Sequence, residues 1–198
     1  LREQVAIATA KNDWAPLGYY AQGAISILNE DYIEGLDLVG HCVRSYSEWQ
    51  PVGPVATICE GLRATLLLRL GDTATAWEIF ASLTPTQNHA NCPARFVAHL
   101  RFVTGDTAGV LSALDDCVVL GDLHSARTMV DVQLLLAAAN YQLGNTATAD
   151  IAFDRSMRLA ARNDMRIPFR LVPDDVMRSM IARAGTRGQS PAVRSLFG

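Results

Sequence analysis

The fold is decided by the stretch Leu66-Leu67-Leu68-Arg69-Leu70-Gly71-Asp72-Thr73-Ala74-Thr75-Ala76. Its apolar run ends at Gly71, which can adopt the left-handed backbone conformation that closes a helix. Asp72 follows and can cap the first amides of a second helix. Ala76 is small enough to let the second helix lie close against the first. The stretch therefore predicts two antiparallel helices joined by a tight turn.

The same register of small residues occurs four times along the chain. A small residue is followed 12 positions later by a second small or branched residue, and four positions later again by a larger apolar one. The first position holds Gly23, Ala64, Ala98 and Ala137, the second holds Gly35, Ala76, Val110 and Ala149, and the third holds Val39, Phe80, Leu114 and Phe153. Small side chains allow close helix crossings, and the larger residue can fill the space between neighbouring hairpins.

Turn signals lie between the small positions of these copies. They are Gly71-Asp72, Gly105-Asp106 and Gly144-Asn145, while the first copy has Glu30-Asp31 and no glycine. The first small positions are separated by 41, 34 and 39 residues. An internal period of this size is typical of stacked two-helix units. An alanine-rich bundle would show some of these coincidences, but four copies with one internal spacing favour a repeat.

Residues 15–163 resemble the tetratricopeptide repeat in their small positions, their Gly-Asp turns and the Ala-xxx-Phe that follows. The first-helix tryptophan and the closing proline of that repeat are largely missing, and two periods exceed 34 residues. This pattern of departures is similar to the degenerate helical repeats of the large LuxR-family transcription regulators, the MalT-like group. The similarity is carried by residues 66–76, 138–145 and 156–161, and by Arg166-Ile167-Pro168-Phe169.

The resemblance implies an effector-recognition and oligomerisation arm of a bacterial regulator. In that family a helix-turn-helix DNA-binding domain would come next, and ATP binding would belong to a domain upstream of Leu1. The sequence contains no phosphate-binding Gly-x-x-x-x-Gly-Lys-Ser/Thr loop of its own. Because it begins Leu1-Arg2-Glu3 without an initiator methionine, we expect it to be a piece of a longer protein.

The sequence predicts an all-α fold, a right-handed superhelical stack (α-solenoid) of tetratricopeptide-like hairpins over residues 1–184. Prolines and turn signals set the expected helix ends. The expected helices span 2–12, 16–29, 31–48, 54–70, 72–83, 93–104, 106–120, 123–143, 145–163 and 174–184, with loops at 49–53 and 84–92. Residues 185–198 are expected to be a linker toward a further domain, with a short helix possible after Pro191.

Composition agrees with a soluble helical protein. Of the 198 residues, 49% are apolar, which suffices for a sizeable core. No uncharged apolar run is long enough to span a membrane. The cysteines have no paired spacing, and Cys42 and Cys117 share one repeat position three residues after the large apolar one. Buried, reduced thiols in a cytosolic setting are therefore expected.

Signals for an enzyme or a metal site are weak, so the sequence predicts neither a catalytic residue, a cofactor nor a metal. The pairs Asp115-Asp116 and Asp174-Asp175 lack a third carboxylate at helical spacing, and the second pair suits a helix start. His89 and Cys92 have a ligand-like spacing, and His99 follows. A zinc site would need a fourth ligand and a second tight pair.

A basic surface is expected near the end of the chain. Between Arg155 and Arg194 there are nine arginines against three aspartates. Arg155, Arg158 and Arg162 fall on one side of the helix expected at 145–163, opposite its apolar stripe. Such a surface can face DNA, phosphate or an acidic partner domain. The alternative is a solvated face, because arginine is the only common cation in this chain.

The expected ligand surface is the concave face of the stack, which the first helix of each unit lines. Counting from the small residue of each unit gives Tyr20, Thr65, Arg69, Arg95, His99, Phe102, Tyr141 and Gln142, with Asp131 at the edge. Aromatic platforms with guanidinium and amide donors suit a sugar, an anionic metabolite or a peptide. The alternative is that the aromatic side chains pack against neighbouring helices.

The sequence therefore predicts a non-catalytic module that senses a small-molecule inducer or a protein partner within a LuxR-type, MalT-like regulator. It would contact other domains of the same regulator, reach DNA only through a domain outside this chain and bind no membrane. The sequence leaves a homo-oligomer open. A protein-interaction scaffold without any link to transcription is the alternative.

Overall fold

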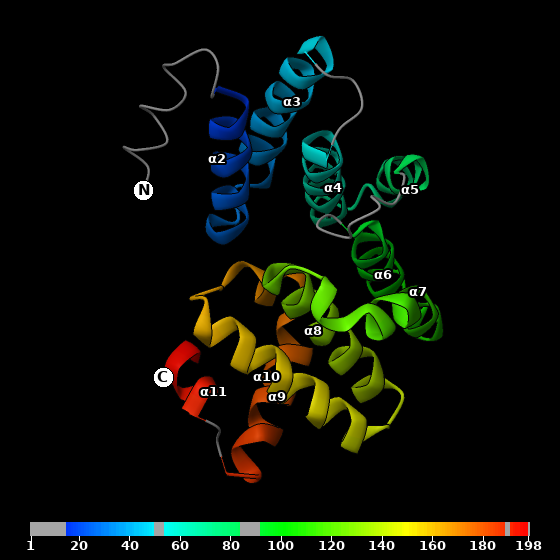
Figure 1. Ribbon diagram of the computed structural model, residues 1–198, viewed down its shortest axis with the longest axis vertical. Helices are drawn as coiled ribbons and strands as arrows, with labels where there is room; N and C mark the ends of the chain where they lie inside the picture. The colour runs from blue at the N-terminus through cyan, green and yellow to red at the C-terminus, as the bar shows by residue number, and fades with distance from the viewer. Residues whose placement is uncertain (1–14, 50–53, 84–91, 189–190, 198) are drawn as a thin grey trace. The chain divides into compact units, whose positions relative to one another are not determined.

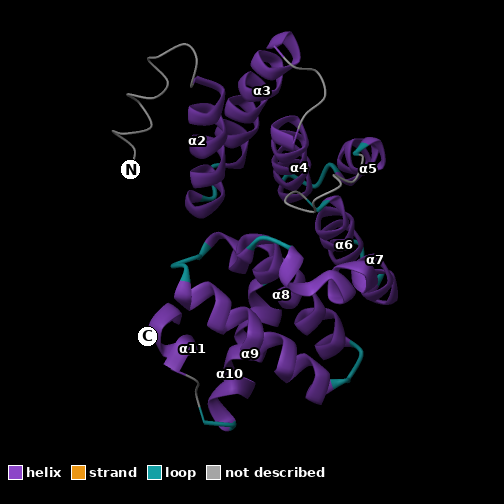
Figure 2. Cartoon of the chain, viewed as in Figure 1, coloured by secondary structure: helices purple, strands orange, loops and turns teal. Residues whose placement is uncertain are grey.

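The computed structural model describes residues 15–49, 54–83, 92–188 and 191–197. Every regular element in these ranges is a helix (Figure 2). The chain divides into two compact units, Leu1–Thr86 and Gln87–Gly198. Among the described helices, none combines the length and apolar character needed to cross a bilayer.

The first unit is a chain of antiparallel helices. They are α2 (Ala15–Asn29), α3 (Tyr32–Trp49), α4 (Pro54–Arg69) and α5 (Thr73–Ser82) (Figure 1). Each helix packs on the next, α2 on α3, α3 on α4 and α4 on α5. Ile27, Val39, Leu62 and Leu66 form the core between the first three helices.

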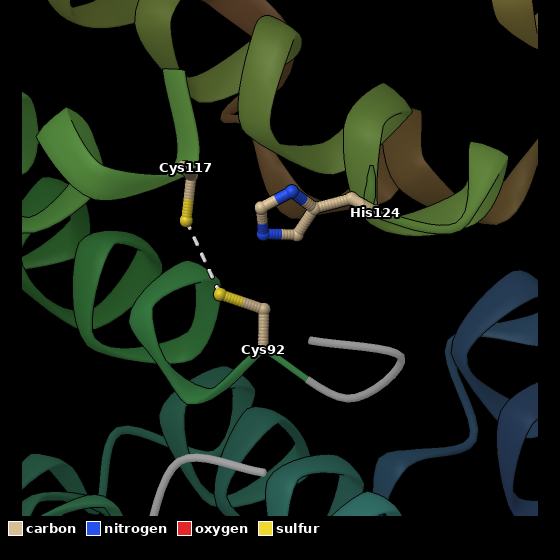
Figure 3. Close-up of side chains that lie close together, drawn as sticks. All are labelled: Cys92, Cys117 and His124. Carbon is tan, nitrogen blue, oxygen red and sulfur yellow. Dashed lines mark hydrogen bonds between the residues drawn. The ribbon is translucent and has the colours of Figure 1, made fainter. Parts of the chain in front are cut away.

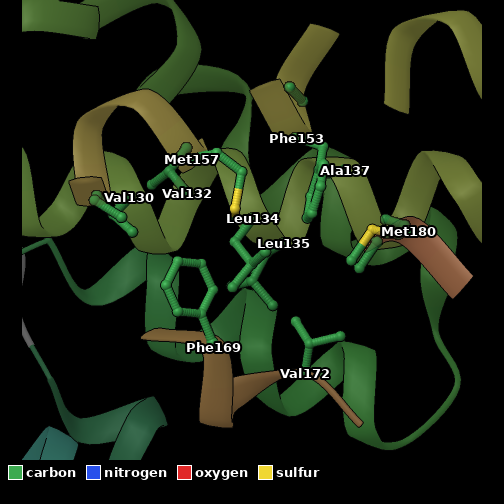
Figure 4. Close-up of a cluster of buried hydrophobic side chains, with 14 of the residues drawn as sticks. Val130, Val132, Leu134, Leu135, Ala137, Phe153, Met157, Phe169, Val172 and Met180 are labelled. Carbon is green, nitrogen blue, oxygen red and sulfur yellow. The ribbon is translucent and has the colours of Figure 1, made fainter. Parts of the chain in front are cut away.

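The second unit is built around one buried helix. Its elements are α6 (Pro93–Val103), α7 (Thr107–Leu120), the 3₁₀ turn η2 (Gly121–Leu123), α8 (Ala126–Gln142), α9 (Thr146–Arg162), the 3₁₀ turn η3 (Ile167–Leu171), α10 (Asp174–Thr186) and α11 (Pro191–Phe197). Helix α8 is buried from Thr128 to Asn140 except at Leu136. It contacts α6, α7, α9 and α10, and its apolar side chains meet Met157, Phe169 and Val172 (Figure 4).

Four helix–helix turns share one hydrogen-bond pattern. In each, a residue with positive φ donates its N–H to the carbonyl three residues earlier, and the next residue donates to the carbonyl five earlier, which closes a helix as a Schellman motif. The positive-φ residues are Glu30, Gly71, Gly105 and Gly144, with φ of 64°, 85°, 82° and 78°. The bonds that span five residues join the amides of Asp31, Asp72, Asp106 and Asn145 to the carbonyls of Ser26, Leu67, Arg101 and Asn140, respectively, at N···O distances of 2.8–3.0 Å.

Side-chain capping after these turns follows the sequence prediction in part. Asp72 accepts a hydrogen bond from the Thr75 amide at 3.1 Å, and Asp106 accepts one from the Gly109 amide at 2.9 Å. Asn145 was expected to cap α9 in the same way, but it makes no such bond. Its side-chain amide donates instead to the Asn140 side chain at 3.3 Å.

The small positions of the first copy lie where α2 and α3 are in close contact. A Cβ atom added at Gly23 would lie 2.5 Å from a Val39 methyl carbon, and one added at Gly35 would lie 2.9 Å from the Ser26 Cβ. In the other copies the small or branched residues and the larger residue after them are buried. The prediction that Ala76, Phe80, Ala149 and Phe153 are buried is confirmed, with exposures of 3% or less.

The expected helix bounds agree with the described ones to within about three residues. The helix expected at 2–12 and most of the loop expected at 84–92 lie outside the described residues. The segment 185–198 was expected to be a linker with a short helix possible after Pro191. Helix α10 extends to Thr186, and α11 lies where that short helix was expected, packed against α9 with Val193 and Leu196 buried.

Candidate functional site

Two members of the expected ligand surface form a buried ion pair in the second unit. The Arg95 guanidinium, on α6, donates to one carboxylate oxygen of Asp131, on α8. Arg127 lies one turn before Asp131, with its Nε 3.6 Å from the other carboxylate oxygen. Asp131 is 2% exposed and Arg95 is 11% exposed. The guanidinium of Arg95 also lies over the Phe96 ring, 4.3 Å from its centroid.

The remaining members on α6 and α8 differ in exposure. His99 and Phe102 are buried, so these two side chains support the packing of the unit. Tyr141 is half-buried against the core around α8. Gln142 is exposed, and its side-chain oxygen accepts a hydrogen bond from the Thr107 hydroxyl at 3.1 Å.

The members in the first unit are Tyr20, Thr65 and Arg69. Tyr20 is half-buried against the core of α2–α4. Thr65 is buried, and its hydroxyl donates to the Gly61 carbonyl at 2.8 Å. The Arg69 guanidinium lies over the Tyr32 ring, 5.8 Å from its centroid. Within the second unit the structure therefore brings Arg95 and Asp131 together, and these three residues belong to a separate unit.

The expected basic surface is exposed at Arg155, Arg158 and Arg162 of α9. Arg158 and Arg162 border a hollow of about 540 Å³ between α9 and the start of α11, whose other lining residues are Ala161, Pro191, Ala192 and Ser195. Its lining is mainly apolar. Two basic side chains between an apolar floor and solvent suit an acidic partner as well as a phosphate group.

Part of the local positive charge is neutralised within the unit. Arg183 of α10 makes a two-pronged hydrogen bond to Asp150 of α9, with both N···O distances at 2.8 Å. This contact raises the pKa of Arg183 above its usual value. Arg187 lies near Asp150 and Asp154, at 3.4 and 3.5 Å. These arginines tie α10 to α9, so the basic surface is smaller than the residue count indicated.

A cluster of two thiols and one imidazole lies elsewhere in the second unit. Cys92 precedes the first residue of α6, Cys117 lies in the last turn of α7, and His124 follows η2. All three are buried, and their ligand atoms lie within 4.8 Å of one another. The two sulfur atoms are 3.2 Å apart, and the imidazole of His124 lies opposite them (Figure 3).

The local structure fixes each of these side chains. Pro93 starts α6 and holds Cys92 in an extended conformation. Gly121 ends α7 with a φ of 46° and a ψ of −114°, which turns the chain so that His124 returns toward α7. The contact with Cys92, together with burial, raises the pKa of the Cys117 thiol.

The first unit contains a second pair of close thiols. Cys42 of α3 and Cys59 of α4 have their sulfur atoms 2.6 Å apart, and both are buried. The pKa of the Cys59 thiol is raised, mainly by its hydrogen bond with Cys42 and also by burial. The sequence prediction of buried, reduced thiols is confirmed for all four cysteines. The sequence did not indicate that Cys42 lies beside Cys59 or that Cys92 lies beside Cys117.

Sequence reasoning missed the cluster of Cys92, Cys117 and His124. It considered Cys92 together with His89, which lies outside the described residues, and with His99. The pairing of Cys92 with Cys117 depends on the packing of α6 against α7. The one available signal was that Cys117 occupies an inward-facing position of the register, three residues after Leu114.

The comparisons with known proteins give no relative. No protein-family model, no curated protein and no solved structure matches this chain.

Proposed function

We propose that this chain is the sensing module of a bacterial LuxR-type transcription regulator similar to the MalT-like group. In this proposal the module is non-catalytic and lies in the cytoplasm. Its hairpins stack as a right-handed superhelix, and it receives a small-molecule inducer or a protein partner. DNA is read by a domain outside this chain.

The observation that carries the proposal is the turn repeated at Glu30, Gly71, Gly105 and Gly144. Each turn joins two helices, so among the described residues α2 to α9 form four helical hairpins with the same turn. A hairpin of this kind cannot bury its apolar face alone, and stacking of such units creates an extended surface. An extended surface of stacked hairpins suits the binding of a partner, whereas catalysis is typical of a concave pocket with a few convergent polar groups.

Within this proposal, Arg95 is the residue that contacts the ligand. Its ion pair with Asp131 holds the guanidinium in one orientation, and 11% of its side chain remains exposed. A guanidinium fixed in this way can offer its remaining N–H groups to a carboxylate, a phosphate or a sugar hydroxyl. Tyr141 and Gln142 would extend the same surface along α8.

A thermal-shift screen of sugars, anionic metabolites and short peptides tests this placement. The Arg95→Lys variant keeps the charge beside Asp131 but loses the planar fork of donors. Arg178→Lys, at an exposed position of α10, is the matched control. A ligand of the proposed site should stabilise the parent chain and the control, and stabilise Arg95→Lys much less. Equal stabilisation of all three would place the site elsewhere.

The regulator and the plain scaffold differ in what the gene encodes after Gly198. A helix-turn-helix supports the regulator, whereas a further repeat or a stop codon supports a scaffold that binds proteins without any link to transcription. Reading that sequence decides between them without a biochemical assay.

A further inference from the structure

We propose that Cys92, Cys117 and His124 bind one zinc(II) ion. The two cysteines bind as thiolates and the histidine binds through Nε2, which leaves a fourth position for a water molecule or an external ligand. Two sulfur ligands and one imidazole are a donor set that zinc(II) prefers. Zinc binding at this cluster does not depend on the role of the chain in transcription.

The ligand atoms lie near the spacing of one tetrahedral ion, and side-chain rotation must supply the remaining adjustment. Two sulfur atoms that are each about 2.3 Å from a tetrahedral zinc ion lie about 3.8 Å from each other. The sulfur atoms of Cys92 and Cys117 are 3.2 Å apart, and all ligand atoms of the cluster fall within 4.8 Å. An opening of about half an ångström, within reach of side-chain rotation, therefore brings the sulfur atoms to the spacing for zinc.

The imidazole of His124 is oriented as a zinc ligand requires. Its Nδ1 lies 3.2 Å from the Gly121 carbonyl oxygen. A carbonyl can only accept, so Nδ1 carries a proton, and in the neutral ring Nε2 then carries the lone pair. Histidines that bind zinc commonly donate their second ring N–H to a backbone carbonyl in this manner, which fixes the tautomer and the ring plane.

Charge favours a divalent cation at this place. Both cysteines bind zinc as thiolates. Zinc binding releases one proton from each thiol to water. The resulting site of one Zn²⁺, two thiolates and a neutral imidazole carries no net charge, which removes the cost of burying an isolated ion.

The pair of Cys42 and Cys59 in the first unit provides an internal comparison. It is also buried and has close sulfur atoms. Among the described residues, however, only the cluster in the second unit joins three potential metal-ligating side chains. Two thiols without a third ligand are a poor zinc site, so Cys59→Ser is a matched control for Cys117→Ser.

The test uses the whole chain, purified and kept under a thiol-free phosphine reductant, with zinc(II) and cobalt(II) as the probes. We expect one metal ion per chain after dialysis. Cobalt should give a thiolate-to-cobalt absorption in the near ultraviolet and the visible bands of a tetrahedral ion, and zinc should displace it. Cys117→Ser and His124→Asn should lose these bands or bind at least about 10-fold more weakly, in the range seen when ligand environments are altered. Cys59→Ser should retain them.

Zinc should also raise the Tm of the reduced parent chain by about 5 °C, since it binds the folded chain only. If Cys117→Ser or His124→Asn does not fold, the cobalt spectrum of the parent chain alone decides. Absence of a thiolate–cobalt band in the reduced parent would overturn the proposal. Bands that persist in Cys117→Ser, or that disappear in Cys59→Ser, would do the same. A Cys92–Cys117 disulfide that persists under the reductant and excludes both metals would assign the cluster to a structural cross-link instead.

Discussion

Glu30 in the α2–α3 turn and Gly144 in the α8–α9 turn adopt the same left-handed backbone conformation, with φ of 64° and 78°. Both amides donate to the carbonyl three residues earlier, at Ile27 and Tyr141. A side chain at such a position costs about 1 kcal/mol because its Cβ atom crowds the backbone. The repeat geometry of the first hairpin is therefore kept in spite of this cost.

Glu30→Gly should raise the free energy of unfolding by about 0.5–1 kcal/mol, since it relieves that crowding. Glu78→Gly makes the same substitution at an exposed position inside α5. There it should lower stability by about 1 kcal/mol, because glycine is a poor helix former. Urea denaturation of both variants checks the opposite signs. Destabilisation by Glu30→Gly would show that the turn is not strained.

The second prediction concerns the crossing of α2 and α3. A Cβ atom at Gly35 would lie 2.9 Å from the Ser26 Cβ and 3.0 Å from a Leu66 methyl carbon. Gly35→Ala should therefore cost about 1–3 kcal/mol through overpacking. In the same helix, a Cβ atom at Gly40 would meet only the flexible end of Arg44. Gly40→Ala should be neutral or stabilising by up to about 1 kcal/mol, and equal effects in thermal unfolding would contradict the close crossing.

These two predictions rest on features that the sequence indicates well. Gly-Asp turns and small residues act locally, so the helix bounds and the burial of Ala76 and Ala149 follow from the register alone. The left-handed Glu30 follows from the register too, because it stands where the other copies have glycine. The candidate sites are harder to predict, because they depend on how helices pack. Arg95 meets Asp131 only once α6 lies on α8, and His124 approaches Cys92 only through the turn at Gly121.

The third prediction concerns the ion pair between Arg95 and Asp131. Arg95→Met would leave the buried carboxylate with the more distant Arg127, and should cost about 2–3 kcal/mol of stability. The double variant Arg95→Met/Asp131→Leu removes both charges and should recover most of that loss. Chemical denaturation of the two single variants and the double variant forms a thermodynamic cycle. Additive losses in the cycle would show that the two side chains do not interact.

The fourth prediction concerns the pH dependence of stability that the Asp72 cap contributes. The Thr75 hydroxyl and amide hydrogen-bond to the Asp72 carboxylate and hold its pKa below the usual value. A group whose pKa is lowered by folding stabilises the fold above its unfolded pKa, and this contribution is lost as the pH falls through the folded pKa. Asp72→Asn should therefore make the unfolding free energy less dependent on pH below about pH 4. Thermal unfolding across a pH series measures this. The same loss of stability at low pH in the parent chain and in Asp72→Asn would show that the cap does not contribute to it.

The last prediction concerns the basic surface at Arg155, Arg158 and Arg162. If it contacts nucleic acid, the contact is electrostatic, so binding to DNA by this chain should be weak, indifferent to sequence and steeply dependent on salt. Arg158→Glu/Arg162→Glu should weaken it and reduce the slope of log K against log salt by about 2, while Arg178→Glu should have a smaller effect.

The apolar floor of the hollow beside these arginines favours an acidic protein domain over phosphate alone, since a phosphate backbone gains nothing from apolar contact. Fluorescence anisotropy with unrelated DNA duplexes across a salt series measures the affinity for DNA and its salt dependence. Tight binding of one duplex in preference to the others would contradict the assignment of sequence reading to a separate domain.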